Sequence, residues 1–585
     1  MLNLALSNLR RLYETNTASP EQIIQQVYDR IESQPLHPVW IELVPRERSL
    51  ERGRSAKGPG PLYGIPFAVK DNIDVAGMPT TAGCPAYSYV PKKTAFVVER
   101  LFEAGAILIG KTNLDQFATG LVGTRSPHGA CRSVFNNGYI SGGSSSGSAV
   151  AVAGGLVSFS LGTDTAGSGR VPAAFNNIIG LKPSRGLLSG SGVVPACRSL
   201  DCVSIFALDC ADAQTVFEVA RGFDEADEFS RKWSPASHAG GAQIRCGVPF
   251  QRQLEFFGDQ SYAALYTDAV SVMRELGVAI VEFDLDPFRE AAQLLYSGPY
   301  VAERFAAVGS FAKANAAAMD PVVASIILAS ERFTAAEAYQ AIYRLAALSR
   351  QTQSAWQHID VMLLPTAPTT YRVDAVQADP IRLNSNLGYY TNFVNLLDLS
   401  AIAVPAGFAE SGLPFGATLV GPTFADEFLL KLAARFHRKR ANLADLPDPE
   451  VASDANGWVK VGVVGAHLSG QPLNFQLTER GARLVRTTRT AKDYKFFALT
   501  NTTPAKPGLI RVPGFDGPGI EIEVWSMPHE KFGSFVAAIP PPLGIGSCLL
   551  EDGELVKGFI CEPYGTERMP EITRYGGWRN YLKSR

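Results

Sequence analysis

Three polar residues, one lysine and two serines, have the types and spacing needed for covalent acyl transfer. Ser144 lies in the run GGSSSGS at 142–148, Ser168 lies in GTDTAGSGR at 162–170, and Lys70 lies upstream of both. A serine hydroxyl attacks a carbonyl only with a base in hydrogen-bond reach, and a buried lysine with a depressed pKa can be that base. Glycine lets backbone N–H groups approach a reacting oxygen closely. This pattern predicts an acyl-transfer site that works without histidine.

The segment that carries the serines has no charged side chain from Ser133 to Thr163, so we expect it to be buried. A flexible linker is disfavoured because the run continues into apolar residues. A phosphate-binding loop is disfavoured because the segment lacks the Gly-Lys-Ser/Thr ending of such loops. An α/β-hydrolase nucleophile turn is disfavoured because neither Ser144 nor Ser168 is central in Gly-x-Ser-x-Gly. The uninterrupted apolar part is also shorter than the roughly 20 residues of a membrane span.

These blocks resemble the amidase signature family over about residues 1–440. The family's motifs stand here as GIPFAVKDN at 64–72, KTNLDQFA at 111–118, the two serine segments, and GLKP at 180–183. Two positions depart from the family pattern. Ser146 replaces a glycine after the first serine, and Ala166 replaces a glycine before the second. An alanine still offers its backbone N–H, so the expected oxyanion hole is compatible with this change.

The resemblance implies a role for each polar residue. Ser168 would be the nucleophile, Lys70 the ultimate base, and Ser144 the proton relay, located at a cis peptide bond. No metal and no organic cofactor is expected, and Asp164 and Arg170 would brace the loop. The oxyanion hole would be formed by the backbone N–H groups of Thr165, Ala166, Gly167 and Ser168.

Two further segments resemble the allophanate hydrolase branch of the family, DQFATGLVGTRSP at 115–127 and RSLDCVSIF at 198–206. In LYSGPYVAER, Tyr296 and Arg304 match the pair with which that branch binds the substrate carboxylate. An arginine fork suits a carboxylate because it can donate two parallel hydrogen bonds. The alternative is an ordinary helix-surface pair, since two residues eight apart share one face of a continuous helix.

The rest of the first 440 residues predicts an α/β fold, with a mixed β-sheet core between helices. Short apolar runs at 106–110 and 361–365 indicate buried strands, and SPEQ at 19–22 predicts a helix start with a capping box. The alanine-rich stretch at 287–357 indicates long helices interrupted near Gly298-Pro299, and we expect it to contribute to a homodimer surface.

A linker is predicted at 441–456, and it is followed by short segments with the residue pattern of β-strands. We therefore expect an amidase domain at 1–440 and a small α+β domain at 457–585. The latter resembles the C-terminal domain of allophanate hydrolases, which is related in fold to γ-glutamyl cyclotransferases. His467 matches the catalytic histidine associated with decarboxylation there, and Glu521 and Glu523 are candidate partners. The alternative is a structural histidine that follows a strand.

The charge balance and the cysteines limit which partners and which compartment are expected for the chain. Its 585 residues include 54 Lys and Arg against 56 Asp and Glu, which disfavours nucleic acid and acidic membranes as partners. The eight cysteines contain no Cys-x-x-Cys pair and indicate reduced thiols of a cytoplasmic protein. The first residues lack an apolar h-region, so no signal peptide is expected.

The expected activity is hydrolysis of allophanate to ammonia and carbon dioxide, coupled to a urea carboxylase or to a ring-degrading pathway. Two alternatives stay open. Another amidase-signature amidohydrolase or a glutaminase-type amidotransferase component would lack the 457–585 domain and the Tyr296/Arg304 pair. A non-enzymatic scaffold would require a broken triad, whereas Lys70, Ser144 and Ser168 are all present.

Overall fold

The computed structural model divides into two compact units, Met1–Asp448 and Pro449–Arg585. The predicted linker at 441–456 lies outside the described residues, and the domain boundaries at 440 and 457 stay a prediction. The expected homodimer and the cytoplasmic location also stay predictions. The structure describes residues 3–33, 38–56, 58, 60–234, 243–296, 298–440, 458–499, 502, 504–512, 514–552, 554–567 and 569–584.

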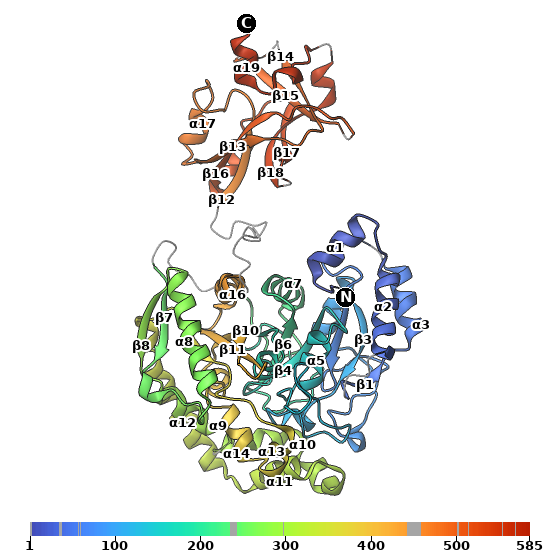
Figure 1. Ribbon diagram of the computed structural model, residues 1–585, viewed down its shortest axis with the longest axis vertical. Helices are drawn as coiled ribbons and strands as arrows, with labels where there is room; N and C mark the ends of the chain where they lie inside the picture. Colours follow the sequence, from blue (N-terminus) through green and yellow to red (C-terminus); the bar gives the residue numbers. More distant parts are fainter. Residues whose placement is uncertain are drawn as a thin grey trace. The chain divides into compact units, whose positions relative to one another are not determined.

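Eleven strands of the described residues form one mixed sheet through the first unit (Figure 1). Strand β2 runs parallel to β3 and β4, and β7 runs parallel to β8 and β9, whereas the other neighbours are antiparallel. The α/β prediction with a mixed sheet is confirmed. In sheet order the strands are β1 (Trp40–Leu43), β3 (Ile107–Thr112), β2 (Pro66–Lys70), β4 (Phe159–Asp164), β6 (Cys202–Ala207), β5 (Ile179–Lys182), β10 (Ser400–Phe408), β11 (Pro414–Gly421), β9 (Val361–Pro365), β7 (Arg245–Pro249) and β8 (Ala279–Phe283).

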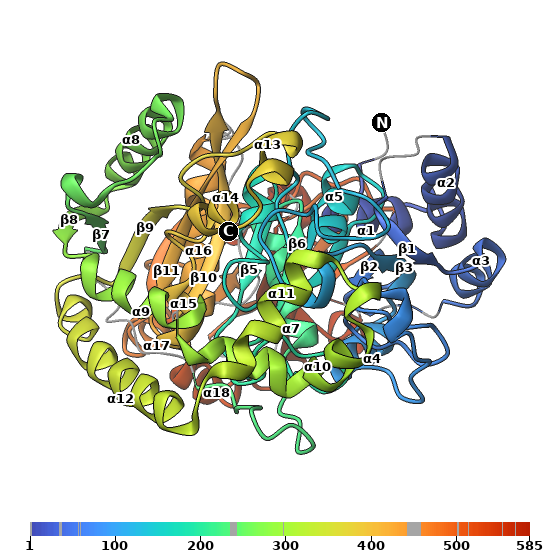
Figure 2. The same ribbon diagram turned by 90° about the horizontal axis from the view of Figure 1, so that it is seen from below.

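The central strands are buried along their whole length, as expected for strands covered on both faces. The apolar runs predicted as strands correspond to β3 and β9. Figure 2 shows the helices that surround the sheet. The helices of this unit are α1 (Leu6–Glu14), α2 (Pro20–Ser33), α3 (Arg46–Ser55), α4 (Phe96–Glu103), α5 (Ser146–Ala153), α6 (Val171–Phe175), α7 (Cys210–Ala220), α8 (Gln260–Glu275), α9 (Asp286–Tyr296), α10 (Ala302–Asn315), α11 (Pro321–Ala329), α12 (Ala335–Thr352), α13 (Val373–Ala378), α14 (Arg382–Leu387), α15 (Phe393–Leu396) and α16 (Asp426–Arg440).

Helix α2 begins with the predicted capping box. The Gln22 N–H donates to Ser19 Oγ at 3.2 Å, and the Ser19 N–H donates to the Gln22 side-chain oxygen at 2.8 Å. These two bonds satisfy backbone donors that have no partner inside the helix. The apolar face of the helix, which includes Ile23, Ile24 and Val27, is buried in the core of the unit.

The alanine-rich stretch is broken between Tyr296 and Arg304, where the sequence predicted an interruption. Helix α9 ends at Tyr296, a short 3₁₀ turn spans Pro299–Val301, and α10 begins at Ala302. Proline has no N–H to donate to the preceding turn, so it cannot continue a helix. Tyr296 and Arg304 therefore do not share the face of one helix, as the alternative explanation of their spacing required.

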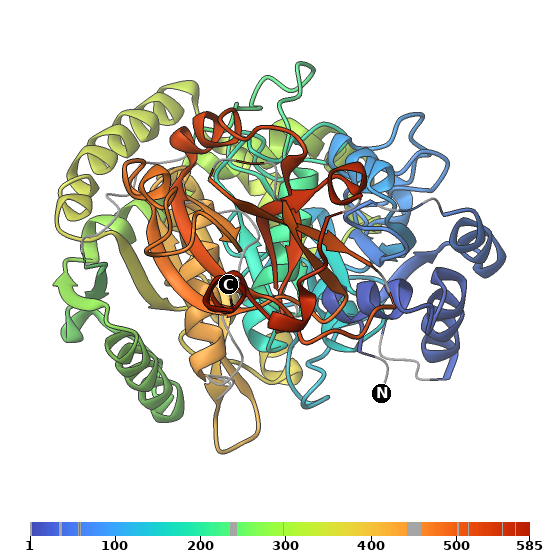
Figure 3. The same cartoon turned by 90° about the horizontal axis from the view of Figure 1, so that it is seen from above.

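The second unit is built on a five-stranded sheet and a separate two-stranded ribbon (Figure 3). The predicted β-rich segments correspond to β12, β14 and β16 of this unit. Its buried core includes Val461, Ile522, Trp525 and Phe535. In order the sheet contains β13 (Arg483–Arg489), β16 (Glu521–Pro528), β12 (Trp458–Val463), β18 (Leu555–Cys561) and β17 (Leu543–Leu549), the ribbon contains β14 (Tyr494–Leu499) and β15 (Lys506–Arg511), and the helices are α17 (Phe475–Thr478), α18 (His529–Val536) and α19 (Trp578–Lys583).

Two observations concern the chain as a whole. All eight cysteines are free thiols and are buried. Among the described helices, none combines the length and the apolar character required to cross a membrane.

Candidate active site and the C-terminal pocket

Lys70 is the last residue of β2, in the interior of the central sheet, and its side chain is fully buried. Its Nζ lies 2.7 Å from Ser144 Oγ and 2.7 Å from Thr163 Oγ1. Burial lowers the pKa of Lys70 to about 7, although the nearby charge of Asp115 acts in the opposite direction. A lysine with this pKa is partly neutral near neutral pH, so it can accept a proton from a serine hydroxyl.

Ser144 lies on a backbone that is closely packed on every side. The Gly143–Ser144 peptide bond is cis, and residues 140–152 are all buried. The next residue, Ser145, accepts the Thr163 N–H at 3.2 Å and donates to the Thr163 carbonyl at 3.0 Å. These bonds join the serine-rich segment to β4, the strand that pairs with the strand of Lys70. Ser144 and Lys70 are therefore held in place by the same part of the sheet.

Asp115 fixes the segment from the other side. Its carboxylate accepts backbone N–H groups from Val122 at 3.1 Å, Gly123 at 3.0 Å and Arg125 at 2.9 Å. Its own N–H donates to the Ser144 carbonyl at 3.0 Å. A side chain at Gly143 would place Cβ 2.2 Å from an Asp115 oxygen, so only glycine is accommodated there.

Ser168 lies in the turn that follows β4 and is 3% exposed. Its Oγ lies 3.5 Å from the Gly120 carbonyl, and the described residues contain no hydrogen bond between the Ser168 and Ser144 hydroxyls. Gly167 has φ of +152°, and a Cβ there would lie 2.5 Å from Thr391 Oγ1. Ala166, the residue that departs from the family pattern, is not among the residues with positive φ. Its methyl group is therefore tolerated, as the oxyanion prediction required.

A buried ion pair holds this turn in place. Arg170 donates from Nε and Nη2 to the two oxygens of Asp164, each at 2.9 Å, and both side chains are fully buried. The Gly169 N–H donates to Asp164 at 3.0 Å. Burial alone would raise the pKa of Asp164, but the charge and hydrogen bonds of Arg170 hold it below its ordinary value. The predicted bracing contact between Asp164 and Arg170 is present.

The backbone N–H groups of the turn are available to a reacting oxygen. Within the described part of the chain, no protein acceptor is bonded to the N–H of Ala166, Gly167 or Ser168, nor to that of Thr165. Successive N–H groups without acceptors are the donors that an oxyanion hole requires. They directly follow β4, the strand beside that of Lys70. This position is compatible with the predicted roles, which stay predictions.

Arg304 is 2% exposed and forms no ion pair with a described carboxylate. Its Nη1 donates to Thr119 Oγ1 at 2.9 Å and its Nη2 to the Tyr296 hydroxyl at 3.4 Å. Its Nε is buried without a hydrogen-bond partner. A buried guanidinium is costly unless an anion compensates its charge. The structure therefore brings together the predicted pair and leaves donors free for an anion.

Some residues of the site were not identified from the sequence. Thr163 receives the second hydrogen bond of Lys70, and Asp201 accepts the Thr165 hydroxyl and the Ala196 N–H, the latter at 2.8 Å. Burial raises the pKa of Asp201. Both residues lie within the motif blocks that carry the resemblance. The sequence of such a block does not indicate which side chains these short polar residues contact.

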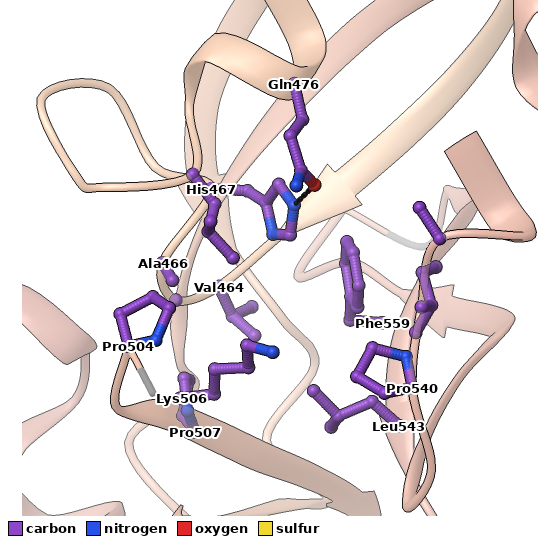
Figure 4. A pocket seen from close by; sticks show the side chains of 14 residues that line it. Val464, Ala466, His467, Gln476, Pro504, Lys506, Pro507, Pro540, Leu543 and Phe559 are labelled. Atoms are coloured by element: carbon purple, nitrogen blue, oxygen red, sulfur yellow. Dashed lines mark hydrogen bonds between the residues drawn. The ribbon is translucent and has the colours of Figure 1, made fainter. Parts of the chain in front are cut away.

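His467 follows β12 in the second unit and lines a cavity of about 230 Å³ (Figure 4). Its Nε2 lies 2.9 Å from the Gln476 side-chain oxygen, and its ring stacks on Phe559 with 4.8 Å between centroids. Burial lowers the pKa of His467, and the charge of Lys506 acts in the same direction. Burial therefore favours the neutral form of His467, and the ring lies beside a pocket, so its predicted catalytic role stays a prediction.

The two glutamates considered as partners of His467 have other partners. Glu523 accepts the Ser469 N–H at 2.8 Å and the Arg579 guanidinium at 2.6 Å, and Glu521 also pairs with Arg579. Their side chains are used by the ion pairs that anchor the last helix. The partner of His467 is instead Gln476, a neutral side chain that the sequence did not single out.

No group of three or more His, Cys, Asp or Glu side chains in the described residues is arranged to hold a metal ion.

Two family models match the chain. Residues 22–430 match the model described as Amidase, and residues 459–583 match the model described as Allophanate hydrolase C-terminal domain. The two matches fall in the two compact units.

The chain is 44% identical to urea amidolyase of Saccharomyces cerevisiae, over 96% of this chain but only 32% of that protein. It thus spans about a third of the length of this curated relative. Urea amidolyase of Lachancea kluyveri is 43% identical, over 97% of this chain and 32% of that protein. The solved structure of Kluyveromyces lactis allophanate hydrolase is 43% identical, covers 100% of this chain and 99% of that chain, and superposes with a TM-score of 0.73.

Proposed function

The chain belongs to the amidase family and is a hydrolase of amide bonds, and we propose that it hydrolyses allophanate (urea-1-carboxylate) to ammonia and carbon dioxide. The observation that carries the proposal is the buried Arg304 guanidinium, which has free donors and no carboxylate partner among the described residues. Ser168 and Arg304 both contact the segment 118–120, so an anion at Arg304 would lie near the nucleophile. Allophanate has a carboxylate at one end and an amide at the other.

In the proposed first step, Ser168 Oγ attacks the amide carbonyl carbon and its proton passes through Ser144 to Lys70. The electron pair of the C=O bond moves to oxygen, where the free N–H groups of the 165–168 turn stabilise it. Collapse of this intermediate breaks the C–N bond, and Lys70 returns the proton to the leaving ammonia. Water then attacks the ester by the same route, which releases a dicarboxylated amine and restores Ser168.

In the proposed second step, the dicarboxylated amine loses carbon dioxide in the C-terminal unit. One C–N bond breaks, its electron pair stays on nitrogen, and a proton joins that nitrogen. The carbamate that results takes up a second proton, from water, and its C–N bond breaks to release ammonia and a second carbon dioxide. His467 would supply the proton, because a bound dianion favours the protonated imidazole that burial disfavours.

Allophanate is urea that carries one carboxylate, so we place this enzyme after a reaction that carboxylates urea. The urea amidolyase name of the S. cerevisiae relative supports this place in the sequence of reactions. Degradation of a nitrogen-rich ring is the other source that would supply the same substrate.

Ammonia release from allophanate, glutamine, malonamide and urea tests the proposal. We expect allophanate to be the preferred substrate, and Ser168→Ala to lower its turnover about 10⁴-fold or more. Preference for glutamine would overturn the substrate assignment and favour the amidotransferase alternative. Equal turnover by Ser168→Ala would overturn the nucleophile assignment.

Arg304→Gln tests the carboxylate contact with a shorter, uncharged side chain that can still form hydrogen bonds. We expect kcat/KM for allophanate to fall about 10²- to 10³-fold, because a buried charged hydrogen bond is lost. Turnover of malonamide, which has no carboxylate, should change far less. Arg350→Gln on the exposed face of α12 is the matched control and should leave both substrates unaffected. An equal loss for both substrates would show that Arg304 only supports the fold.

A further inference from the structure

We propose that Lys506 is the anion-binding residue of the His467 pocket, and that this pocket takes a small dicarboxylate. The identity of the natural dicarboxylate rests on the proposed function, which makes it the product of the amide-cleaving step. The binding site itself rests on the contacts, charges and packing around Lys506.

The position of Lys506 follows from a close contact between two chain segments. Gly465 follows β12, and a Cβ at this residue would lie 2.2 Å from Pro507 Cδ. Only glycine lets the loop before His467 lie directly against the start of β15. Lys506 is the first residue of that strand, so this contact places it beside His467. Figure 4 shows its ammonium group directed into the space enclosed by His467, Phe559 and Pro540.

Among the described residues, no carboxylate compensates the charge of Lys506, unlike the charges of its neighbours on the ribbon. On the same two-stranded ribbon, Lys495 pairs with Glu571 at 3.3 Å and Arg511 pairs with Asp493 at 2.7 Å. Lys506 has no ion pair and no side-chain hydrogen bond among the described residues, although it is half-buried. A cation that is partly removed from water and left unpaired favours binding of an anion.

The lining of the pocket has one sign of charge. The described lining residues include His467 and Lys506 but no aspartate or glutamate. Most of the other lining residues have apolar side chains, among them Pro504, Pro507, Pro540, Ile539, Leu543 and Phe559. Partial removal of Lys506 from water strengthens the attraction between its ammonium and a carboxylate. A volume of about 230 Å³ is sufficient to hold a small dicarboxylate.

The arrangement offers separate partners for two carboxylates. Lys506 Nζ can bind one, while the Gln476 oxygen accepts from His467 Nε2 and leaves Nδ1 as the ring nitrogen that gains or loses a proton. Arg480, whose guanidinium lies 5.9 Å from the Phe535 ring centroid, is the other cation that acts on His467. The pocket therefore has the chemistry of a dianion site with one fixed charge and one titratable group.

Malonate is a stable dicarboxylate of suitable size and serves as the probe. The full chain with Ser168→Ala and Arg304→Gln lacks the proposed nucleophile and the guanidinium of the amidase unit, so malonamide is not hydrolysed there. Binding is followed by the His467 imidazole resonances in NMR titrations. We expect malonate to shift these resonances and malonamide, its uncharged analogue, to leave them unchanged. Lys506→Met should weaken malonate binding about tenfold or more, while Lys506→Arg should retain most of it. Lys495→Met is the matched control on the same ribbon and should bind malonate as the parent does.

The NMR titration with pH gives a second measurement that does not depend on ligand. Removal of the Lys506 charge should raise the pKa of His467, and Lys495→Met should raise it less. Equal malonate affinity in the parent and Lys506→Met, or equal shifts with malonamide, would overturn the inference. If wild-type protein releases no ammonia from allophanate but malonate binding depends on Lys506, the proposed function fails and the anion site stands.

Discussion

The candidate active site and the C-terminal pocket hold their lysines in opposite ways. Lys70 is fully buried and bonded to two hydroxyls at 2.7 Å each, and a fully buried ion pair braces the adjacent turn. Lys506 is half-buried and has no polar partner among the described side chains. Nucleophilic attack needs its atoms placed before the substrate arrives, and hydrogen bonds from neighbouring strands supply that order. The pocket needs to attract a charged ligand, for which an uncompensated charge is sufficient.

The two lysines also differ in the protonation state in which each would act. Complete burial makes the neutral amine of Lys70 accessible near neutral pH, as a general base requires. The ammonium of Lys506 lies at a pocket and would act as a cation. In the proposed roles, the same residue type would act as a base in one unit and as an anion partner in the other, because burial and bonding differ.

The largest expected effect is that of Lys70→Met on amide cleavage. Methionine has a similar length and no proton-accepting group, so kcat/KM should fall about 10⁴-fold. Assays of ammonia release measure the loss. Stability should change little, because the variant also removes a buried charge, and thermal unfolding of both proteins checks this.

Lys111→Met is the control that separates catalysis from support. Lys111 is equally buried on the neighbouring strand β3, but it forms an ion pair with Asp71 at 2.9 Å. Its loss leaves that carboxylate unpaired, which should cost about 3–5 kcal/mol of stability. If Lys70→Met destabilised the protein as strongly and kept its activity, the catalytic role of Lys70 would be wrong.

The pH dependence of amide cleavage should follow the base form of Lys70. Its pKa is lowered to about 7, so the neutral form dominates above this pH and the protonated form below it. We expect kcat/KM for allophanate to fall about tenfold per pH unit below 7 and to level off above it. Measurements of initial rates from pH 5 to 9 test the sign. A profile that rises as pH falls would contradict a neutral lysine base.

The smallest expected effect is that of His467→Asn on carbon dioxide release. We expect ammonia release to precede carbon dioxide release, with a delay about tenfold longer than in the wild type. A tenfold effect is smaller than the usual contribution of general acid catalysis, because unassisted decarboxylation competes with the catalysed reaction. Parallel assays of both products measure the delay. Products that appear together in the variant would remove the need for a catalytic C-terminal unit.

The motif blocks predicted the positions of Lys70, Ser144 and Ser168 within a mixed α/β fold, because such blocks combine glycine, polar and apolar residues at fixed spacing. The break near Gly298-Pro299 was also predictable, since proline cannot continue a helix. The consequence of that break was not predictable. It places Tyr296 and Arg304 on separate elements whose side chains meet, at 3.4 Å between Arg304 Nη2 and the Tyr296 hydroxyl.

Contacts between residues distant in sequence could not be assigned from the sequence. Thr163 meets Lys70 only because β2 and β4 are neighbours, and Asp115 meets Ser144 only through a loop packed beside both. The proposed partners of His467 were wrong for the same reason. Glu521 and Glu523 lie on the neighbouring strand β16, but their carboxylates face Arg579.

The sequence by itself determined which residue types could cleave an amide without histidine. It also determined the family and the change to strand-forming segments after residue 457. Those features are local, because each depends on residues close together in the chain. Only the tertiary structure decided which polar groups pair and which stay unpaired. From the sequence, Arg304 was a candidate anion partner only through the family resemblance, and Lys506 had no assigned role. Both become candidate anion sites on structural grounds because folding removes them from water without carboxylate partners among the described residues.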